Sequence, residues 1–301
     1  MFETLGLVCR YGRLIYLHTQ DPMRWARFCL RSAWKFHPSL TWLRYIESTP
    51  FLAQAPENIR RVLADKIHRP FARCHLTTTQ RVNALITHYD ILADLFPQPL
   101  LERIVEGRRV HIATLAGQHS DETYTITLSR EMLSQHQGEL TFLMLDVQSE
   151  VPLARLVVNL CRNADGTIQL VFNGMQGPGP EYKKRIVEVT RNLDGLRPKR
   201  AVVEVATAFA EAIGAHSIVA IGKKTTYPRA RQNGNVATAR IMIVIGKSLR
   251  SLPLPTGITC FHRKLSDANQ KTSLPKSATP RSVVTPFWTH SITKRSRPSF
   301  L

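Results

Sequence analysis

A glycine- and proline-rich turn, Asn-Gly-Met-Gln-Gly-Pro-Gly-Pro-Glu at residues 173–181, lies between an expected strand and an expected helix. Such a turn exposes backbone N–H groups at the start of a helix, where the helix dipole also favours negative charge. Lone turns of this composition are usually ordinary tight turns, and a phosphate-binding loop at Gln176, Gly177 and Gly179 is the alternative. The negative charge of Glu181 would repel a phosphate, which disfavours a phosphate-binding loop at this turn.

Basic residues follow this turn, and those expected on the protein surface are Lys183, Lys184, Arg191, Arg197 and Lys199. Helix faces of this kind are usually solvated, and an anion-binding face is the alternative. His216 and Glu204 could do acid–base chemistry, but nothing in the sequence places them together, so no catalytic residue is assigned. His111, His119 and His136 lack the spacing of metal ligands, so we expect no metal.

The chain carries a formal net charge of +19, and this charge is unevenly distributed. After residue 240, ten Lys and Arg residues are accompanied by a single acidic residue, Asp267. The remaining part is moderately basic, which favours nucleic acid, an anionic membrane surface or an acidic partner. The five cysteines are scattered and suit a reducing compartment. No segment is apolar enough to span a bilayer, so we expect a cytoplasmic protein, peripheral at the inner membrane if it binds lipid.

Residues 1–105 are expected to form a helical N-terminal region. Within residues 22–36, basic side chains recur at Arg24, Arg27, Arg31 and Lys35, which places them on one stripe of a helix. Aromatic residues occupy the other side. The pattern predicts an amphipathic helix packed on the core, and the alternative is a membrane-surface or nucleic-acid face made from the basic stripe.

Residues 106–238 are expected to form an α+β domain with a largely antiparallel sheet. The predicted strands are 124–128, 140–145, 154–161 and 167–173, followed by helices at 181–193 and 199–213 and a returning strand at 217–221. The helical N-terminal region would pack on this sheet. A meander followed by a Gln-x-x-Gly turn and a helix resembles the layout of N-acyltransferases of the GNAT type. That resemblance implies acyl-CoA as the cofactor.

Several segments together resemble the VirK/YbjX family of bacterial proteins. The segments are His88-Tyr89, Gly138-Glu139-Leu140, Met175-Gln176-Gly177-Pro178, the run Thr-Arg-Asn-Leu-Asp-Gly-Leu-Arg-Pro-Lys at 190–199, and residues 227–236. The resemblance covers residues 10–238. It implies a cytoplasmic protein linked to virulence, surface-protein production and envelope resistance to cationic peptides, with no established enzymatic activity and no catalytic residues. Lys223 and Lys224 depart from the family pattern, which has Asn and His before Tyr227.

Residues 239–301 do not continue the family pattern and form a Ser/Thr/Pro/Lys-rich string without periodicity. Back-translation with one common offset of the reading frame recovers family-like segments in order, so we predict a frameshifted C-terminus after residue 238. Such a segment has not been selected to bury an apolar face, and we expect it to be disordered. Its apolar start, Ile241–Ile245, could add an edge strand.

The leading functional hypothesis is thus a VirK-like accessory protein that supports envelope integrity, cationic-peptide resistance or surface-protein production. One alternative is a GNAT-like N-acyltransferase that binds a CoA-type cofactor. The other is a basic module that binds RNA or the inner-membrane surface.

Overall fold

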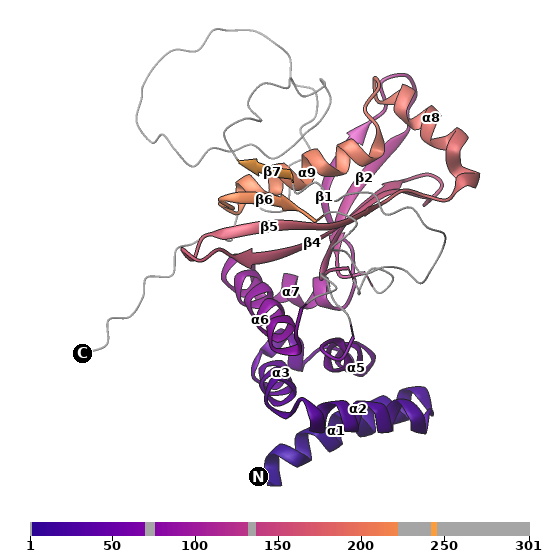
Figure 1. The fold of residues 1–301 in the computed structure, drawn as a ribbon. Coiled ribbons are helices and arrows are strands. Elements are labelled where there is room, and N and C mark those ends of the chain that lie inside the picture. Colours follow the sequence, from indigo (N-terminus) through magenta and orange to yellow (C-terminus); the bar gives the residue numbers. More distant parts are fainter. Residues whose placement is uncertain (1, 70–75, 132–136, 222–241, 246–301) are drawn as a thin grey trace, which may run out of the picture. The chain divides into compact units, whose positions relative to one another are not determined.

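The computed structural model describes residues 2–69, 76–131, 137–221 and 242–245 (Figure 1). Helices make up the first part of the chain, as the sequence predicts for residues 1–105. They are α1 (Phe2–Thr19), α2 (Pro22–Trp34), α3 (Phe36–Ser48), α4 (Pro50–Ala53), α5 (Glu57–Lys66), α6 (Thr78–Leu95) and α7 (Gln98–Val105).

The starts of these helices follow from their sequences. Proline occupies the first turn of α2, α4 and α7, where its missing N–H is not needed. At the start of α6, the Thr77 hydroxyl accepts a hydrogen bond from the backbone N–H of Gln80. In return, the side-chain oxygen of Gln80 accepts a hydrogen bond from the backbone N–H of Thr77. This reciprocal pair of hydrogen bonds satisfies two donors that the helix itself cannot.

The helical region has its own aromatic core around Trp42. The indole of Trp42 is fully buried, donates a hydrogen bond of 2.8 Å to the carbonyl of Leu63, and stacks on the rings of Tyr45 and Tyr89. These contacts join α3 to α5 and α6. Helices α1 and α2 contact each other, and both contact α3.

The second part of the described chain is a seven-stranded sheet in the order β1-β2-β3-β4-β5-β6-β7. Its strands are β1 (Val110–Ala116), β2 (Thr123–Ser129), β3 (Leu140–Asp146), β4 (Pro152–Arg162), β5 (Ile168–Gln176), β6 (Ser217–Ala220) and β7 (Met242–Ile245). All neighbours are antiparallel except β5 and β6, which are parallel. The expected α+β class with a largely antiparallel sheet is confirmed.

The centre of the sheet is covered by helices. Every residue of β3 is buried, as are most of those of β4. Helix α9 (Pro198–Ala212) contacts β3 and β4, α6 contacts β4, and α7 contacts β2. Phe209 of α9 meets Phe142 of β3 edge to face at 5.3 Å and stacks on Phe96, which follows α6. Aromatic pairs thus join the helical region to the sheet.

Two turns at element ends have glycines with a positive φ. Residues 163–166 form the loop between β4 and β5, and Gly166 has a positive φ of 81°. Gly214 follows α9 with a φ of 69°, as expected for a glycine that ends a helix. The predicted helices at 181–193 and 199–213 appear as a short 3-10 helix η2 (Pro180–Tyr182), α8 (Lys183–Asn192) and α9.

The structure adds one strand that the sequence analysis missed. Strand β1 carries polar residues and a register shift between His111 and Ala113, so its alternation of apolar and polar residues is interrupted. The edge strand expected from Ile241–Ile245 is found as β7, paired with β6. The predictions for residues 222–241 and 246–301, including the family departure at Lys223 and Lys224 and the tail, lie outside the described residues.

Candidate functional site

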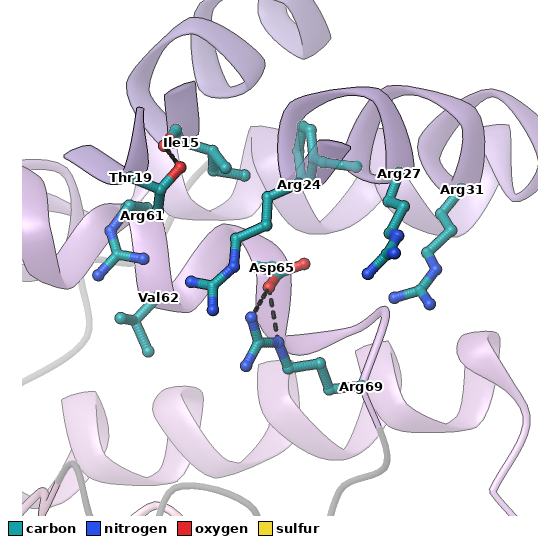
Figure 2. A pocket seen from close by; sticks show the side chains of 10 residues that line it. Ile15, Thr19, Arg24, Arg27, Arg31, Arg61, Val62, Asp65 and Arg69 are labelled. Atoms are coloured by element: carbon teal, nitrogen blue, oxygen red, sulfur yellow. Dashed lines mark hydrogen bonds and ion pairs between the residues drawn. The ribbon is translucent and has the colours of Figure 1, made fainter. Parts of the chain in front are cut away.

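A pocket of about 450 Å³ lies among α1, α2 and α5, and guanidinium groups dominate its lining (Figure 2). Its polar and charged lining residues are Thr19, Arg24, Arg27, Arg31, Arg61, Asp65 and Arg69, and Ile15, Phe28 and Val62 supply apolar wall. Figure 2 shows the α2 arginines extending from one side and the residues of α5 and the following turn from the other. The pocket therefore concentrates positive charge on facing helices.

The α2 wall of the pocket is fixed by the way this helix begins and packs. The Asp21 carboxylate accepts hydrogen bonds from the backbone N–H groups of Met23 and Arg24, which caps the helix. Phe28 and Ser32 are the buried residues of α2. Anchoring by Phe28 leaves the neighbouring stripe of arginines directed at the pocket.

The opposite wall is held by ion pairs and backbone contacts. Arg69 binds the Asp65 carboxylate with nitrogen–oxygen distances of 2.5 and 2.6 Å. Arg81 of α6 donates to the carbonyls of Ile67 and Arg69 at 2.9 and 2.8 Å. These bonds hold the turn after α5, so that Arg69 and Asp65 stay at the pocket wall.

The charges in this pocket repel one another. Burial lowers the pKa of Arg61, and the charges of Arg24 and Arg69 lower it further. Burial also lowers the pKa of His68 to about 4, with the charges of Arg31 and Arg81 acting in the same direction. His68 is therefore neutral at pH 7, where its ring shares a 3.0 Å hydrogen bond with the Ser32 hydroxyl. The positive charge of the pocket arginines therefore exceeds the negative charge of Asp65, the carboxylate in the pocket lining.

The exposed surface of α1 and α2 carries several large apolar side chains. Of the ten large apolar side chains that are exposed in the described ranges, six lie on these two helices: Tyr16, Leu17, Met23, Trp25, Leu30 and Trp34. Met23, Leu30 and Trp34 are 57%, 70% and 83% exposed, and their positions i, i+7 and i+11 place them on one stripe of α2. Helix α2 thus has a buried face, an arginine stripe and an exposed apolar stripe.

This arrangement differs from the expected packing of α2. The sequence predicts that its aromatic side packs on the core, but only Phe28 among its aromatic residues is buried, while Trp25 and Trp34 are exposed. The alternative, a membrane-surface or nucleic-acid face made from the basic stripe, stays a prediction, and Arg24, Arg27 and Arg31 of that stripe line the pocket. The facing residues of α5 were not predicted, because their proximity depends on tertiary packing.

The predicted phosphate loop lies between β5 and η2. Gly177 is exposed, while Gln176 and Gly179 are half-buried. The Glu181 carboxylate lies against Gly179, and the methylene chain of Lys199 lies over Gly177. A phosphate at Gly179 would thus meet the carboxylate directly. Binding at this loop stays a prediction.

The predicted basic surface is exposed at all five positions, Lys183, Lys184, Arg191, Arg197 and Lys199. Arg185 behaves differently from these neighbours. Its guanidinium bonds the buried carboxylate of Asp146 at 2.5 Å and that of Glu122 at 3.0 Å, which ties α8 to β2 and β3. Arg185 is therefore part of the packing of α8.

A second charged cluster is buried where the helical region meets the sheet. Glu139 forms ion pairs with Lys66 of α5 and, at 3.1 Å, with Arg130 after β2. The Tyr89 hydroxyl donates to Glu139, and the backbone N–H of Glu139 donates to the side chain of Asn159 at 2.8 Å. Burial alone would raise the pKa of Glu139, but the charges of Lys66 and Arg130 hold it at about 2. Glu139 is thus an anion that binds two buried cations.

His88 lies in the same region and is fully buried. Its Nδ1 accepts a hydrogen bond of 3.0 Å from the backbone N–H of Leu160 in β4. Burial lowers the pKa of His88 to about 4. Sequence reasoning quoted His88, Tyr89 and Glu139 only as family-like residues, and no local pattern could show that they meet.

The motif at 190–199 ends α8 and starts α9. Asn192 donates to the hydroxyls of Ser120 and Tyr124 and accepts from the backbone N–H of His119. Asp194 and Gly195 then take positive φ angles of 48° and 84°. The motif is therefore a turn that docks on the β1–β2 connection.

The chain matches a protein-family model and is similar to a protein of Escherichia coli. A family model described as a protein of unknown function, DUF535, matches residues 18–238. The chain belongs to this family. It is also 26% identical over 200 residues to the uncharacterized protein YbjX of Escherichia coli strain K12, a match that covers 66% of this chain and 59% of YbjX.

The DUF535 match begins at the end of α1 and runs beyond β6, so it includes both the arginine pocket, apart from Ile15, and the buried Glu139 cluster. It ends at residue 238, where the sequence analysis places the end of the family-like part. Within the described residues, no group of His, Cys, Asp and Glu could hold a metal ion. No helix in the described ranges is long and apolar enough to cross a membrane.

Proposed function

We propose that this DUF535 protein is a peripheral membrane-binding module that docks on an anionic bilayer through α1 and α2. The observation that carries the proposal is the pairing of two stripes on α2: Met23, Leu30 and Trp34 are exposed to solvent, and Arg24, Arg27 and Arg31 run beside them. Helices that lie in a membrane interface combine an apolar face containing Trp and Leu with Lys or Arg on the polar face.

Each stripe supplies a different part of the binding. Burying large apolar side chains gains about 1.5–3 kcal/mol for each residue that leaves water completely. Each basic residue near an anionic surface adds about 1 kcal/mol, and this part is screened by salt. Tryptophan is favoured at the headgroup level because its ring is apolar while its N–H can still bond water.

A second copy of the chain fits this surface less well. In a two-fold dimer the same patch lies on both subunits, so the arginines of α2 would meet their own copies. Among the described residues, Arg27 and Arg61 form no ion pair that would neutralise them. An anionic bilayer supplies the missing charge.

Vesicle sedimentation tests this proposal with the full chain. Binding to phosphatidylcholine vesicles should be weak and should rise when phosphatidylglycerol is included, with loss at high salt. Leu30→Ser and Trp34→Ser should each weaken this binding, while Val187→Ser, at an exposed apolar position of α8, should not. Binding that is equal for neutral and anionic vesicles, or unaffected by both α2 variants, would contradict the proposal.

Membrane docking fits a VirK-like role in supporting the envelope, because it would place the protein at the inner-membrane surface. RNA is the rival ligand for the same basic stripe. An RNA-binding face would use phosphate contacts and aromatic stacking, so Leu30→Ser should leave RNA binding unchanged. Salt-sensitive binding of RNA oligonucleotides without any binding to anionic vesicles would favour that rival.

An acyltransferase activity is the second candidate, and one observation favours it. The parallel pairing of β5 with β6 ends at Phe172 and Ala220, and β5 continues through Asn173 to Gln176 along β4 only. Asn173 is buried, and within the described residues neither polar atom of its side chain has a hydrogen-bond partner. The side-chain nitrogen of Asn173 lies toward Gly138, ahead of β3, so a ligand that supplies these bonds would have to reach that side of β4.

Calorimetric titration of the full chain with acetyl-CoA tests this candidate. We expect binding that Asn173→Ala weakens and that Val187→Ser does not change. Absence of heat at millimolar acetyl-CoA would contradict the acyltransferase hypothesis and the phosphate loop at Gln176, Gly177 and Gly179 together.

A further inference from the structure

We propose that the arginine pocket among α1, α2 and α5 binds a terminal phosphate group, as found in a phosphomonoester or a pyrophosphate. The proposal rests on the proposed membrane docking for its lipid source, a phosphomonoester headgroup, but the pocket chemistry itself does not depend on it. The pocket is lined by five arginines and a single carboxylate, Asp65, whose Oδ2 is already bound by Arg69.

Arg24 pairs with Asp21 at 3.4 Å and Arg69 with Asp65, whereas Arg27, Arg31 and Arg61 form no ion pair with a described residue. The pKa of Arg61 is lowered by burial and then by the nearby charges of Arg24 and Arg69, which is the effect expected of mutual repulsion. The guanidinium charge that the described carboxylates leave unbalanced favours an anionic ligand in this pocket.

Guanidinium groups are suited to phosphate. Their planar forks donate two parallel hydrogen bonds to neighbouring oxygens, and such charge-assisted bonds are the strong ones. Arg24, Arg27 and Arg31 extend from α2 toward the walls that carry Arg61 and Arg69, as Figure 2 shows. Several forks on facing walls of one pocket suit an anion with more than one negative charge and several acceptor oxygens.

The size and apolar lining of the pocket indicate that the phosphate is attached to a larger group. A volume of about 450 Å³ exceeds what a lone phosphate fills and falls in the range of ligand pockets. Ile15, Phe28 and Val62 provide apolar wall beside the arginines. A glycerol backbone or the start of an acyl chain could contact this wall.

The position of Arg27 connects the pocket to the membrane face. On α2 it lies four residues after Met23 and three before Leu30, so it borders the exposed apolar stripe while it also lines the pocket. A bilayer that receives Leu30 and Trp34 would therefore bring its headgroups to the level of the pocket arginines.

The test uses the full chain and two kinds of probe. Sodium pyrophosphate in calorimetry measures the free anion. Vesicles measure the lipid source. They contain either phosphatidic acid, which is a phosphomonoester, or phosphatidylglycerol, which is a phosphodiester, and both kinds have the same surface potential. The variants are Arg61→Gln and the exposed Arg27→Gln, with Arg44→Gln on α3 as the charge-matched control outside the pocket. Thermal unfolding verifies that each variant is folded, and Arg27→Gln carries the test if Arg61→Gln is not.

We expect pyrophosphate to bind the wild type and the control alike, and each pocket variant to bind about tenfold more weakly or worse. A preference for phosphatidic acid that both pocket variants lose identifies the lipid headgroup as a source. Pyrophosphate binding without any vesicle binding would overturn the membrane proposal and keep the phosphate site. Two results would overturn the phosphate site and keep the membrane proposal. One is vesicle binding without pyrophosphate binding and without a preference for phosphatidic acid. The other is vesicle binding that Arg27→Gln and Arg44→Gln weaken equally.

Discussion

The hydroxyl of Tyr89 donates a hydrogen bond of 2.5 Å to Oε2 of Glu139, which joins α6 to the start of β3 in the fully buried interior. The same carboxylate binds Lys66 and Arg130. Burial lowers the pKa of Lys66 to about 8 even though the negative charge of Glu139 acts to raise it. One carboxylate thus compensates two buried cations, and its removal should have a larger effect than removal of any single hydrogen bond.

Replacing Glu139 by Gln should lower the free energy of unfolding by about 3–5 kcal/mol, because the buried charges of Lys66 and Arg130 would lose the carboxylate that both of them bind. Urea denaturation measures this loss. Tyr89→Phe is the control that keeps every charge and removes one hydrogen bond, with an expected loss of about 1–3 kcal/mol. Equal losses in the two variants would show that the ion pairs contribute nothing beyond the hydrogen bond.

Acid should destabilise the protein between pH 6.5 and 4. Burial lowers the pKa of both His68 and His88 from 6.5 to about 4, so in this range the unfolded chain binds protons that the folded chain does not. The stability is therefore fully present above pH 6.5 and is lost as the pH falls, by about 1.4 kcal/mol per pH unit for each histidine.

Urea denaturation at a series of pH values between 6.5 and 5.5, where the carboxylates contribute little, measures this slope. His68→Gln should reduce it by about half, since one of the two histidines is then absent. A stability that does not change between pH 6.5 and 5.5 would contradict the burial of both neutral rings.

Fluorescence should separate the exposed Trp34 from the buried Trp42. Trp34 is 83% exposed on the proposed membrane face, whereas Trp42 is fully buried and bonds the carbonyl of Leu63. In a chain whose Trp25 and Trp288 are replaced by Phe, so that Trp34 and Trp42 are the tryptophans left, brominated acyl chains should quench part of the emission in anionic vesicles, and Trp34→Phe should remove most of that quenching. The same variant should change the free energy of unfolding by less than about 0.5 kcal/mol. Quenching that survives in Trp34→Phe would place the membrane contact elsewhere.

Gly195→Ala should destabilise the turn between α8 and α9 by about 1 kcal/mol. Gly195 has a φ of 84°, and a Cβ there would meet nothing within 4 Å, so the cost comes from the backbone conformation alone. Gly6→Ala in α1 is the matched control, because it also has open space around it but an ordinary helical backbone. That change should be neutral or stabilise by about 0.5–1 kcal/mol. A similar loss in both variants would contradict the assigned cause.

Local patterns predicted the elements well where one physical rule dominated. β-Branched and aromatic residues located β2 to β6. Strand β1 was missed because its register shift near His111 interrupts the period of two that reveals strands.

The candidate site could be predicted only in part. The spacing of Arg24, Arg27 and Arg31 gives one wall of the pocket from the sequence. The other wall comes from Arg61 and Arg69, which are far along the chain and approach α2 only because α1, α3 and α5 pack together. The pairing of Lys66 with Glu139 joins residues that are even farther apart, and no rule of spacing connects them.

The Glu139 cluster also bears on the predicted boundary between residues 1–105 and 106–238. Lys66 and Tyr89 lie on one side of that boundary, and Arg130 and Glu139 lie on the other. Separating the two parts would leave charged groups of each without their partners, which costs several kcal/mol per ion. The free energies of the helical region and the sheet are therefore coupled, so calorimetry should record one cooperative transition and neither fragment should fold when it is expressed alone.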